Sequence, residues 1–326
     1  PLMKTLILHN NDLFPTIGLG LWKIPKRNAA QTVYDAIKAG YRHLDSACDY
    51  GNEAEVGQGI AQALGDGLCN RDELWVTSKL WNTYHKREHV HPALKRTLND
   101  LQLDYLDLYL IHFPIAQEFV PFDIRYPPEW SHNPNADPQI QFAKVPIHET
   151  WSAMEDLVSK ELVRNIGVCN FGTALLGDLL NCAEILPSVL QVERHPYLEQ
   201  GKLVRFSQQA GIAVTGFSPL GAGSYLELGM AQPEDSVLEE SIVKDFAQAH
   251  GKTPAQVVLR WGIQQGTAVI PKTTNAEHLQ ENIDVYDFAL TDEQMAAISA
   301  LDRRHRFNDP GVFCEKAFNT FCPIYE

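Results

Sequence analysis

Residues 74–112 read LWVTSKLWNTYHKREHVHPALKRTLNDLQLDYLDLYLIH, and the pattern of this stretch predicts the class of fold. Two short apolar runs in it, Leu74–Lys79 and Leu106–Ile111, are typical of buried strands. Between them, Ala93–Leu101 carries apolar residues at helical spacing. Strand, helix and strand in this order predict two parallel strands whose connecting helix covers the sheet.

The same alternation continues in both directions along the chain. Helical periodicity recurs at Thr32–Ile37 and Trp151–Leu162, and Thr253 followed by Pro254 predicts the start of a helix over Ala255–Gln264. Eight strands that alternate with helices in a chain of this length predict a closed (β/α)8 TIM barrel. The six further strands are expected at Ile17–Leu21, His43–Asp45, Asn165–Val168, Val189–Glu193, Ala213–Phe217 and Ala268–Ile270.

The predicted barrel takes up residues 1–326 as a single domain. An N-terminal hairpin is expected ahead of it, with strands at Thr5–His9 and Leu13–Pro15. The stretch Pro114–Pro146 is rich in Pro, Asn and Asp and is predicted to be a long irregular loop, which in a compact domain is usually functional or disordered. The aromatic residues of Phe313–Glu326 indicate that a C-terminal loop packs over the mouth of the pocket.

Composition excludes several classes of function. The chain carries 27 Lys and Arg against 41 Asp and Glu, a net charge of −14, whereas nucleic-acid binding usually needs a basic surplus and anionic membranes repel an acidic protein. No apolar run reaches the ~18 residues that predict a membrane span. The six Cys residues are scattered without a Cys-x-x-Cys pair, which predicts reduced thiols, no metal site and a cytoplasmic location.

Polar residues follow the strands at the end where a barrel holds its chemistry. Asp45 ends the second strand and Tyr50 comes shortly after it, Lys79 ends the third strand, and His112 follows the fourth. Any one of them alone is well explained as a cap or an ion pair, but four at one rim indicate a catalytic site. The Lys ammonium is expected to lower the pKa of the Tyr hydroxyl, the Asp to hold the Lys, and the His to bond a carbonyl oxygen. Such a set protonates an oxygen while hydride reaches the adjacent carbon.

No side chain donates hydride, so this chemistry requires a cofactor. The sequence has no Gly-x-Gly-x-x-Gly turn, and Gly18-Leu19-Gly20 is interpreted as tight packing in the first strand. Lys272-Thr273-Thr274-Asn275, at the last strand–helix junction, offers a charge, hydroxyls and helix N-terminal amides for a phosphate. Phe217 either stacks on a nicotinamide ring or packs in the core.

These residues carry a family resemblance that covers nearly the whole chain. The chain resembles the aldo-keto reductases, whose catalytic tetrad falls on Asp45, Tyr50, Lys79 and His112. The segments that carry the resemblance are Gly18-Leu19-Gly20-Leu21-Trp22-Lys23, Leu44-Asp45-Ser46-Ala47, Tyr50-Gly51-Asn52-Glu53, Thr77-Ser78-Lys79-Leu80-Trp81-Asn82, Asp104–His112, Ile166-Gly167-Val168-Cys169-Asn170-Phe171 and Val269-Ile270-Pro271-Lys272.

The resemblance implies NADPH as the cofactor, with NADH as an alternative. Cys169 stands where the family usually has Ser, which puts one nicotinamide hydrogen bond in doubt. His278 stands where the family usually has Arg, so we expect a weaker preference for NADPH over NADH than in relatives. The cofactor contacts that the resemblance implies are Asn170, Gln191, Phe217, Ser218, Leu220, Lys272, Thr273, Thr274, Asn275, His278, Glu281 and Asn282.

Within the family the chain is most similar to the xylose reductases, through Phe113, the loop 119–128 and Arg306-Phe307-Asn308-Asp309-Pro310. This implies reduction of an open-chain aldose, D-xylose to xylitol, with Tyr50 as the general acid. Asn-Asp-Pro is also a natural turn, which is the alternative for Asn308 and Asp309. The implied substrate contacts are Trp22, Asp49, His112, Phe113, Asn308 and Asp309, with Trp81 as a further part of the apolar wall.

Two other interpretations stay open. The substrate could be a sugar phosphate or another small aldehyde, or the chain could be a non-catalytic, nucleotide-binding regulatory subunit that kept the fold. The sequence leaves a homodimer open as its assembly.

Overall fold

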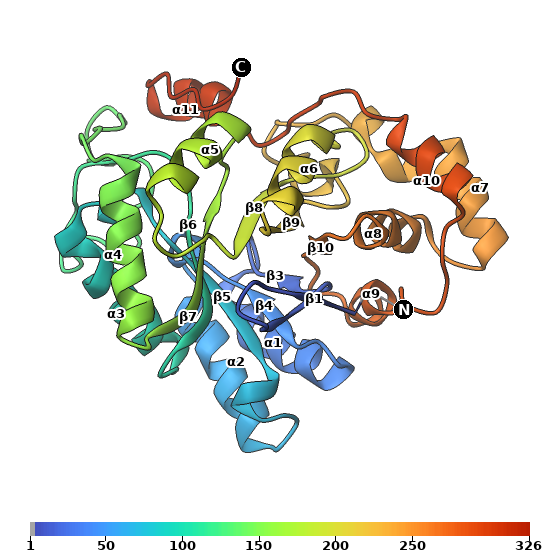
Figure 1. The fold of residues 1–326 in the computed structure, drawn as a ribbon, viewed down its shortest axis with the longest axis horizontal. Coiled ribbons are helices and arrows are strands. Elements are labelled where there is room, and N and C mark those ends of the chain that lie inside the picture. Colours follow the sequence, from blue (N-terminus) through green and yellow to red (C-terminus); the bar gives the residue numbers. More distant parts are fainter. Residues whose placement is uncertain (1–3) are drawn as a thin grey trace. The chain divides into compact units, whose positions relative to one another are not determined.

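A computed structural model of the chain describes residues 4–326 (Figure 1). These residues form two compact units, each assembled from several separate segments. The first unit comprises the residues up to Gly20 with Asp35–His43 and Gln191–Asn308, and the second comprises Leu21–Tyr34, Leu44–Leu190 and Asp309–Glu326. Helix α1 (Lys26–Ala39) has residues in both units.

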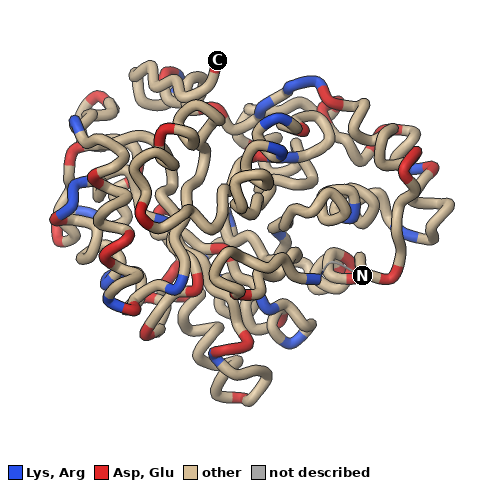
Figure 2. The backbone as a smooth tube through the Cα atoms, viewed as in Figure 1, with Lys and Arg blue, Asp and Glu red and all other residues tan. Residues whose placement is uncertain are grey.

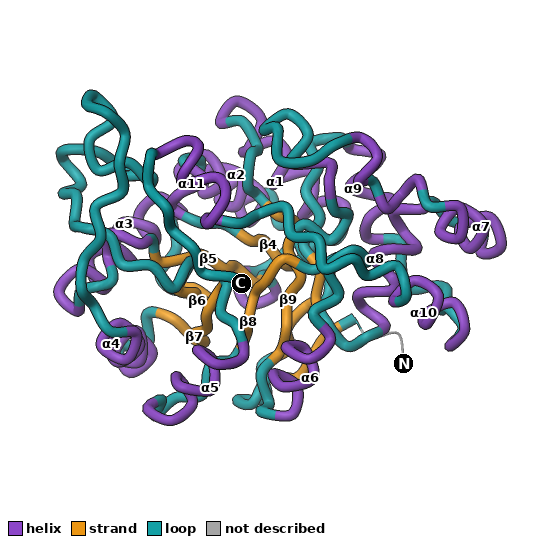
Figure 3. Tube along the Cα trace, turned by 90° about the horizontal axis from the view of Figure 1, so that it is seen from above, coloured by secondary structure: helices purple, strands orange, loops and turns teal. Residues whose placement is uncertain are grey.

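The second unit contains strands in the order β7-β6-β5-β4, although His43, the first residue of β4, belongs to the first unit. Every residue of β4, β5 and β6 is buried. Parallel pairing places Lys79 opposite Leu110 and Leu110 opposite Gly167, so the carboxyl ends of β5, β6 and β7 lie level. In Figure 3, α3 and α4 lie outside these strands, as the strand–helix alternation predicts. The elements are β4 (His43–Asp45), β5 (Trp75–Leu80), β6 (Leu106–Ile111), β7 (Val163–Cys169), α2 (Glu53–Gly65), α3 (Arg87–Leu101), α4 (Ile147–Ser159), α5 (Thr173–Cys182) and α11 (Pro310–Phe318), with 3-10 turns η1 (Cys48–Tyr50), η2 (Arg71–Glu73) and η3 (Asn82–Tyr84).

The first unit contains strands in the order β10-β9-β8, with β9 and β10 paired in parallel. Its helices α7, α8 and α10 enclose a core that includes Val257, Trp261 and Ile298. The elements are β1 (Thr5–Ile7), β2 (Leu13–Pro15), β3 (Leu19–Gly20), β8 (Val189–Glu193, whose first two residues belong to the second unit), β9 (Ala213–Phe217), β10 (Ala268–Val269), α6 (Gly201–Gln209), α7 (Ser241–His250), α8 (Pro254–Gln264), α9 (Ala276–Ile283) and α10 (Asp292–Ser299), with 3-10 turns η4 (Ala222–Ser224), η5 (Pro233–Asp235) and η6 (Val237–Glu239).

The eight-stranded sheet closes on itself within the first unit. Strands β3 and β10 are the two ends of the sheet, and Ile17 forms a parallel bridge to Val269 beside them. The Gly20 amide donates to the carbonyl of Pro271 at 3.1 Å, and a Cβ on Gly20 would lie 2.6 Å from the Ile270 carbonyl oxygen. The closed (β/α)8 barrel and the tight packing predicted for Gly18-Leu19-Gly20 are therefore confirmed.

Element boundaries differ from the prediction where local hydrogen bonds end a strand or a helix early. The hairpin of β1 and β2 is antiparallel as expected, but β1 ends at Ile7 because the Leu8 amide already bonds the Asp12 carbonyl across the turn. Helix α4 ends at Ser159 because Glu161 adopts a left-handed φ of 60°, which leads directly into β7. Helix α8 begins as predicted, with the Thr253 hydroxyl accepting from the Gln256 amide.

The C-terminal segment is more ordered than the predicted loop. Its first part forms the nine-residue helix α11, and residues 319–326 have no helix or strand. The Asp309 side chain accepts a hydrogen bond from the Gly311 amide at 2.8 Å, and Pro310 occupies the first helical turn. Asp followed by Pro is a helix-start signal, so this helix could have been predicted from the sequence.

Charged residues of both signs are spread over the described part of the chain (Figure 2). Figure 2 shows Lys and Arg interspersed with Asp and Glu along the backbone. Among residues 4–326, no helix has both the length and the apolar character that a bilayer span requires. The same residues contain no group of three or more His, Cys, Asp or Glu side chains placed to bind a metal ion.

Candidate active site

Three of the predicted catalytic residues meet at one buried ammonium group in the second unit. Lys79 projects from β5, and its Nζ donates to Asp45 Oδ2 at 2.7 Å, to the Ser46 carbonyl at 2.9 Å and to Tyr50 Oη at 3.1 Å. Both Lys79 and Asp45 are 1% exposed. Asp45 ends β4, which neighbours β5 in the sheet, and Tyr50 ends the short turn η1 that follows β4.

Burial controls the protonation of this cluster. It raises the pKa of the Tyr50 hydroxyl above its ordinary value, and the charge of Lys79 only partly opposes this effect. The net direction is therefore opposite to the lowering expected from the sequence, because desolvation of a tyrosinate outweighs the attraction of the ammonium. Burial would lower the pKa of Lys79, but the charge of Asp45 raises it above its ordinary value. At neutral pH the site thus holds a protonated Tyr50 beside a charged Lys79.

His112 lies at the carboxyl end of β6 and faces the same cluster. Its ring is 6.0 Å from the Tyr50 ring in an edge-on arrangement. Burial, aided by the Lys79 charge, holds the pKa of His112 well below its ordinary value, so the imidazole is neutral. Its buried Nδ1 has no hydrogen-bond partner among the described residues. A neutral imidazole beside a tyrosine hydroxyl can orient a carbonyl oxygen without competing as an acid.

An aromatic wall surrounds His112. Phe113 stacks on the His112 ring at 4.9 Å, and Trp81 meets it edge-on at 5.3 Å. Trp130, from the long loop, lies 5.0 Å from Trp81 and 5.1 Å from Phe113. Phe113 and Trp81 were expected here, whereas Trp130 was missed. The only signal for Trp130 was an aromatic residue within a Pro-rich loop that follows a catalytic strand.

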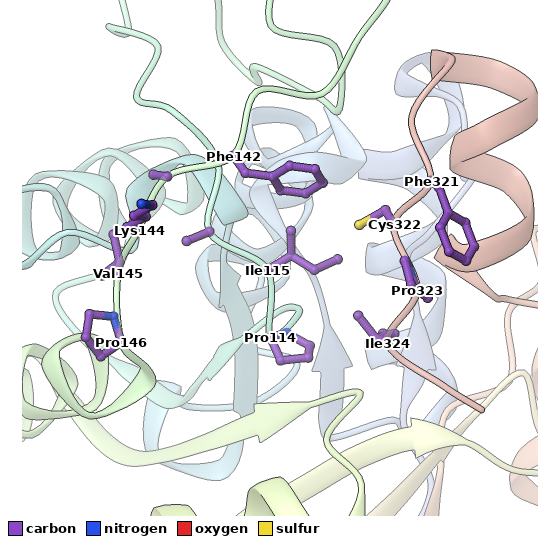
Figure 4. A pocket seen from close by; sticks show the side chains of 12 residues that line it. Pro114, Ile115, Phe142, Lys144, Val145, Pro146, Phe321, Cys322, Pro323 and Ile324 are labelled. Atoms are coloured by element: carbon purple, nitrogen blue, oxygen red, sulfur yellow. The ribbon is translucent and has the colours of Figure 1, made fainter.

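The long loop and the C-terminal segment pack against each other beside this wall. Trp130 contacts Phe313 of α11 at 5.4 Å. The Ile140 amide donates to Thr320 Oγ1 at 3.0 Å. Figure 4 shows the cavity between these segments, which has a volume of about 560 Å³ and is lined mainly by apolar side chains. Its lining residues are Pro114, Ile115, Ala116, Phe142, Ala143, Lys144, Val145, Pro146, Phe321, Cys322, Pro323 and Ile324.

Asn170, a predicted nicotinamide contact, is joined to His112 by a hydrogen bond. It adopts a left-handed φ of 61° directly after β7. Its Nδ2 donates to the His112 carbonyl at 2.9 Å, and its Oδ1 accepts from the Tyr325 hydroxyl at 3.0 Å. A side-chain amide has two N–H donors and two acceptor positions, so one of each remains for a ligand. Tyr325 is a contact that sequence reasoning missed.

The predicted phosphate segment adjoins the start of α9 in the first unit. Asn275 caps this helix, because its Oδ1 accepts from the amides of Glu277 at 2.8 Å and His278 at 3.1 Å. The Asn275 amide in turn donates to Thr273 Oγ1 at 3.0 Å. Two of the helix N-terminal amides are thus bonded to the cap, and the expectation that this helix start helps to hold a phosphate stays a prediction. Lys272 and Thr273 remain half-buried, and Thr274 is exposed.

The other predicted cofactor contacts of the first unit fall on strand ends and on α9. Gln191 is buried within β8, and Phe217 is the half-buried last residue of β9. Ser218 Oγ lies 2.6 Å from Tyr225 Oη, which ties down the loop that contains Leu220. On α9, His278 is exposed, Glu281 is half-buried and Asn282 is buried.

The predicted substrate contacts differ from one another in burial and in their partners. Asp49, next to Tyr50 in η1, is half-buried, and burial of its carboxyl group, with Glu129 nearby, raises its pKa to about 7. Trp22 is half-buried, with the Lys23 ammonium 5.6 Å from its ring. The Asn308 amide donates to Glu193 Oε1 at 2.8 Å. The Asp309 side chain caps α11, because its Oδ1 accepts from the Gly311 amide at 2.8 Å, and its role as a sugar contact stays a prediction.

Comparisons with known proteins agree with this arrangement. The model of the Aldo/keto reductase family matches residues 16–303. The probable NAD(P)H-dependent D-xylose reductase xyl1 of Emericella nidulans is 49% identical over 308 residues, which is 94% of this chain and 96% of that protein. The NAD(P)H-dependent D-xylose reductase xyl1 of Aspergillus niger is 46% identical over 323 residues, which is 98% of this chain and 99% of that protein.

Two solved structures share the fold at substantial identity. The aldose reductase of Schistosoma japonicum has a TM-score of 0.86 and 34% identity, covering 98% of this chain and 99% of that one. The Bombyx mori aldo-keto reductase in complex with NADP has a TM-score of 0.84 and 36% identity, covering 96% of this chain and 97% of that one. With a barrel closed between β3 and β10 and a Tyr50–Lys79–Asp45 cluster at its strand ends, this chain belongs to the aldo/keto reductase family.

Proposed function

We propose that this protein is an NAD(P)H-dependent reductase of open-chain aldoses that converts D-xylose to xylitol. The observation that carries the proposal is the Lys79 ammonium in contact with both Asp45 and Tyr50, because this arrangement holds a proton ready at a buried hydroxyl. The two fungal relatives named as D-xylose reductases, each matched along almost its whole length, support the choice of substrate. We further propose that residues 1–326 act as one domain in the cytoplasm.

The residues present fit a nicotinamide dinucleotide. Asn170 keeps a donor and an acceptor for a carboxamide, and Phe217 ends β9 with a half-buried ring that suits stacking. Lys272, Thr273 and Thr274 supply a cation and two hydroxyls for a phosphate, and His278 lies exposed on the next helix. When bound, the reduced nucleotide supplies the hydride. Because His278 is no permanent cation, we expect NADPH to be preferred over NADH but by a modest factor.

The chain's own residues handle the proton and the position of the aldehyde. Tyr50 gives its proton to the aldehyde oxygen as negative charge develops there, and Lys79 stabilises the tyrosinate that remains. Asp45 keeps Lys79 charged and in place. His112, neutral because it is buried, donates a hydrogen bond to the same oxygen and orients it. The wall of Trp81, Phe113 and Trp130 excludes water, which strengthens each of these interactions.

Selectivity for a sugar needs polar contacts beyond the aldehyde. We assign Asn308, Asp309 and Asp49 to sugar hydroxyls, with Trp22 as part of the apolar wall. The raised pKa of Asp49, about 7, lets this carboxyl act as donor or acceptor near neutral pH.

The test is the loss of absorbance of the reduced nicotinamide, measured with NADPH and NADH in parallel. D-xylose and DL-glyceraldehyde serve as substrates, and Tyr50→Phe serves as the variant. We expect oxidation with both substrates, faster with NADPH, and almost none in Tyr50→Phe although that variant still binds NADPH. Turnover of glyceraldehyde without turnover of xylose would reject the sugar assignment. Full activity of Tyr50→Phe would reject the mechanism.

A further inference from the structure

A buried carboxylate in the first unit holds the segment that carries Asn308. Glu193 is the last residue of β8 and is 0% exposed. Its Oε1 accepts from the Asn308 amide at 2.8 Å, and its Oε2 accepts from the Phe307 amide at 2.9 Å. The Nε2 of His195, also 0% exposed, lies 2.8 Å from Oε2. Two consecutive backbone amides are thus fixed by one side chain that is more than 100 residues away in sequence.

The segment needs such an anchor because it has no regular structure of its own. Between α10 and α11 the chain runs without helix or strand, and Arg304 adopts a left-handed φ of 52°. Phe307 is buried, stacks on Tyr225 at 5.6 Å and contacts His195 at 5.2 Å. Asn308, the next residue, is half-buried. The backbone of Asn308 is therefore held from the inside while its side chain keeps access to solvent or a ligand.

We propose that Glu193 is a positioning residue for sugar recognition, which acts by fixing the backbone of Asn308. The inference rests on the proposed function, in which Asn308 bonds a sugar hydroxyl. A hydroxyl contact requires a donor or acceptor placed to within a few tenths of an ångström, because hydrogen bonds weaken steeply with distance and angle. Glu193 touches neither the reacting carbonyl nor the proton donor, so its effect falls on recognition and not on proton transfer.

A carboxylate can accept both backbone amide bonds, which the amide group of glutamine cannot do. A buried carboxylate must be compensated by hydrogen bonds, and the two amides and the imidazole provide them. Glutamine at this position would retain one acceptor oxygen but would turn an N–H donor toward the other backbone amide. One of the two anchoring bonds would be lost and the segment pushed away. Glu193→Gln is therefore a nearly isosteric change that loosens Asn308 without emptying the core.

The proposal predicts an effect that depends on the hydroxyls of the substrate. With NADPH at saturation, Glu193→Gln should raise the KM for D-xylose about tenfold, the size expected for loss of one charge-assisted hydrogen bond. The KM for propanal, which carries no hydroxyl, should change less than about twofold, and kcat should change little for either aldehyde. A residue that only stabilises the fold would affect the two aldehydes alike.

A double-mutant cycle tests whether Glu193 acts through Asn308. Asn308→Ala alone should raise the KM for xylose at least as much as Glu193→Gln does, and the double variant should be no worse than Asn308→Ala. Glu240→Gln is the matched control, because Glu240 binds Arg303 of the same segment but has no bond to Asn308. We expect the xylose KM of this control to equal that of the wild type.

The results distinguish failure of the positioning role of Glu193 from failure of the proposed function. If the effects of Glu193→Gln and Asn308→Ala multiply, or if propanal suffers as much as xylose, the positioning role is overturned. If Asn308→Ala leaves the xylose KM unchanged, Asn308 is no sugar contact and the inference fails with it. If the wild type reduces propanal but not xylose, the proposed function itself fails. Should Glu193→Gln not fold, Glu193→Asp keeps the charge one methylene short of the amides and should show the same selective loss.

Discussion

Asp45→Asn removes the charge that compensates Lys79 while keeping nearly the same side-chain volume. The Lys79–Asp45 pair is separated by 2.7 Å, and both partners are 1% exposed. Removing one partner of a buried pair leaves an uncompensated charge, which typically costs about 3–5 kcal/mol. Lys79 keeps its bonds to the Ser46 carbonyl and to Tyr50, so we expect the lower end, a loss of about 3 kcal/mol in the free energy of unfolding.

The assay is equilibrium urea unfolding of the wild type and Asp45→Asn, with Asp156→Asn as the control. Asp156 pairs with Arg87 at 2.6 Å, but these side chains are 56% and 50% exposed. An exposed pair contributes little, so the control should lose less than about 1 kcal/mol. Equal losses in the two variants would refute the claim that burial makes the Lys79–Asp45 pair costly to break.

The pH dependence of the same measurement gives a second check. The folded pKa of Lys79 is raised above its unfolded value of about 10.4, so the stabilisation from its charged form is complete below that pH and is lost only as pH rises further. In Asp45→Asn burial is no longer opposed by that carboxylate and lowers the pKa of Lys79, so the deficit should be largest at pH 6 and should shrink towards pH 9 as Lys79 loses its proton. Catalysis should fall as well, by about 10²-fold or more in kcat, because the proton donor depends on an ordered Lys79. A deficit that grows between pH 6 and pH 9 would contradict this account.

Three further perturbations test separate features. Burial raises the pKa of Glu53 from 4.5 to about 7, so between these values the folded protein holds a proton that the unfolded chain releases. The free energy of unfolding of the wild type, relative to that of Glu53→Gln, should therefore fall between pH 5 and pH 7. A difference between the two proteins that stays constant with pH would contradict this. Gly20→Ala should destabilise the closed barrel by about 1–3 kcal/mol in thermal unfolding, because its Cβ would meet the Ile270 carbonyl oxygen at 2.6 Å. Gly65→Ala, which meets nothing within 4 Å, is its control and should not destabilise. His278→Arg should raise the ratio of NADPH to NADH kcat/KM several-fold, and an unchanged ratio would remove this residue from the cofactor site.

The sequence predicted that Asp45, Lys79 and His112 lie together because the three residues follow one rule. Asp45, Lys79 and His112 each end or follow a buried strand, and parallel strands bring their carboxyl ends to one rim. The direction of the Tyr50 pKa could not be predicted in the same way, since it depends on how completely the surrounding side chains exclude water. Strand periodicity reports which face is buried but not the local dielectric.

Contacts made by irregular segments were beyond sequence reasoning for a different reason. Trp130 reaches the aromatic wall through a loop whose course no periodicity determines. Glu193 and Phe307 are joined only in the folded chain, and the Tyr325–Asn170 bond links residues 155 positions apart. Helix α11 was predictable in principle, because Asp309 followed by Pro310 is a helix-start signal.

The aromatic wall also makes the protein a suitable subject for optical spectroscopy. Trp81 and Trp130 lie 5.0 Å apart, both next to rings that surround His112, and the chain has only six Trp residues in all. Replacing either one by Phe and comparing emission spectra would assign part of the intrinsic fluorescence to this wall. Quenching of that component by an aldehyde or a nucleotide would then report occupancy directly, without turnover and without an added dye.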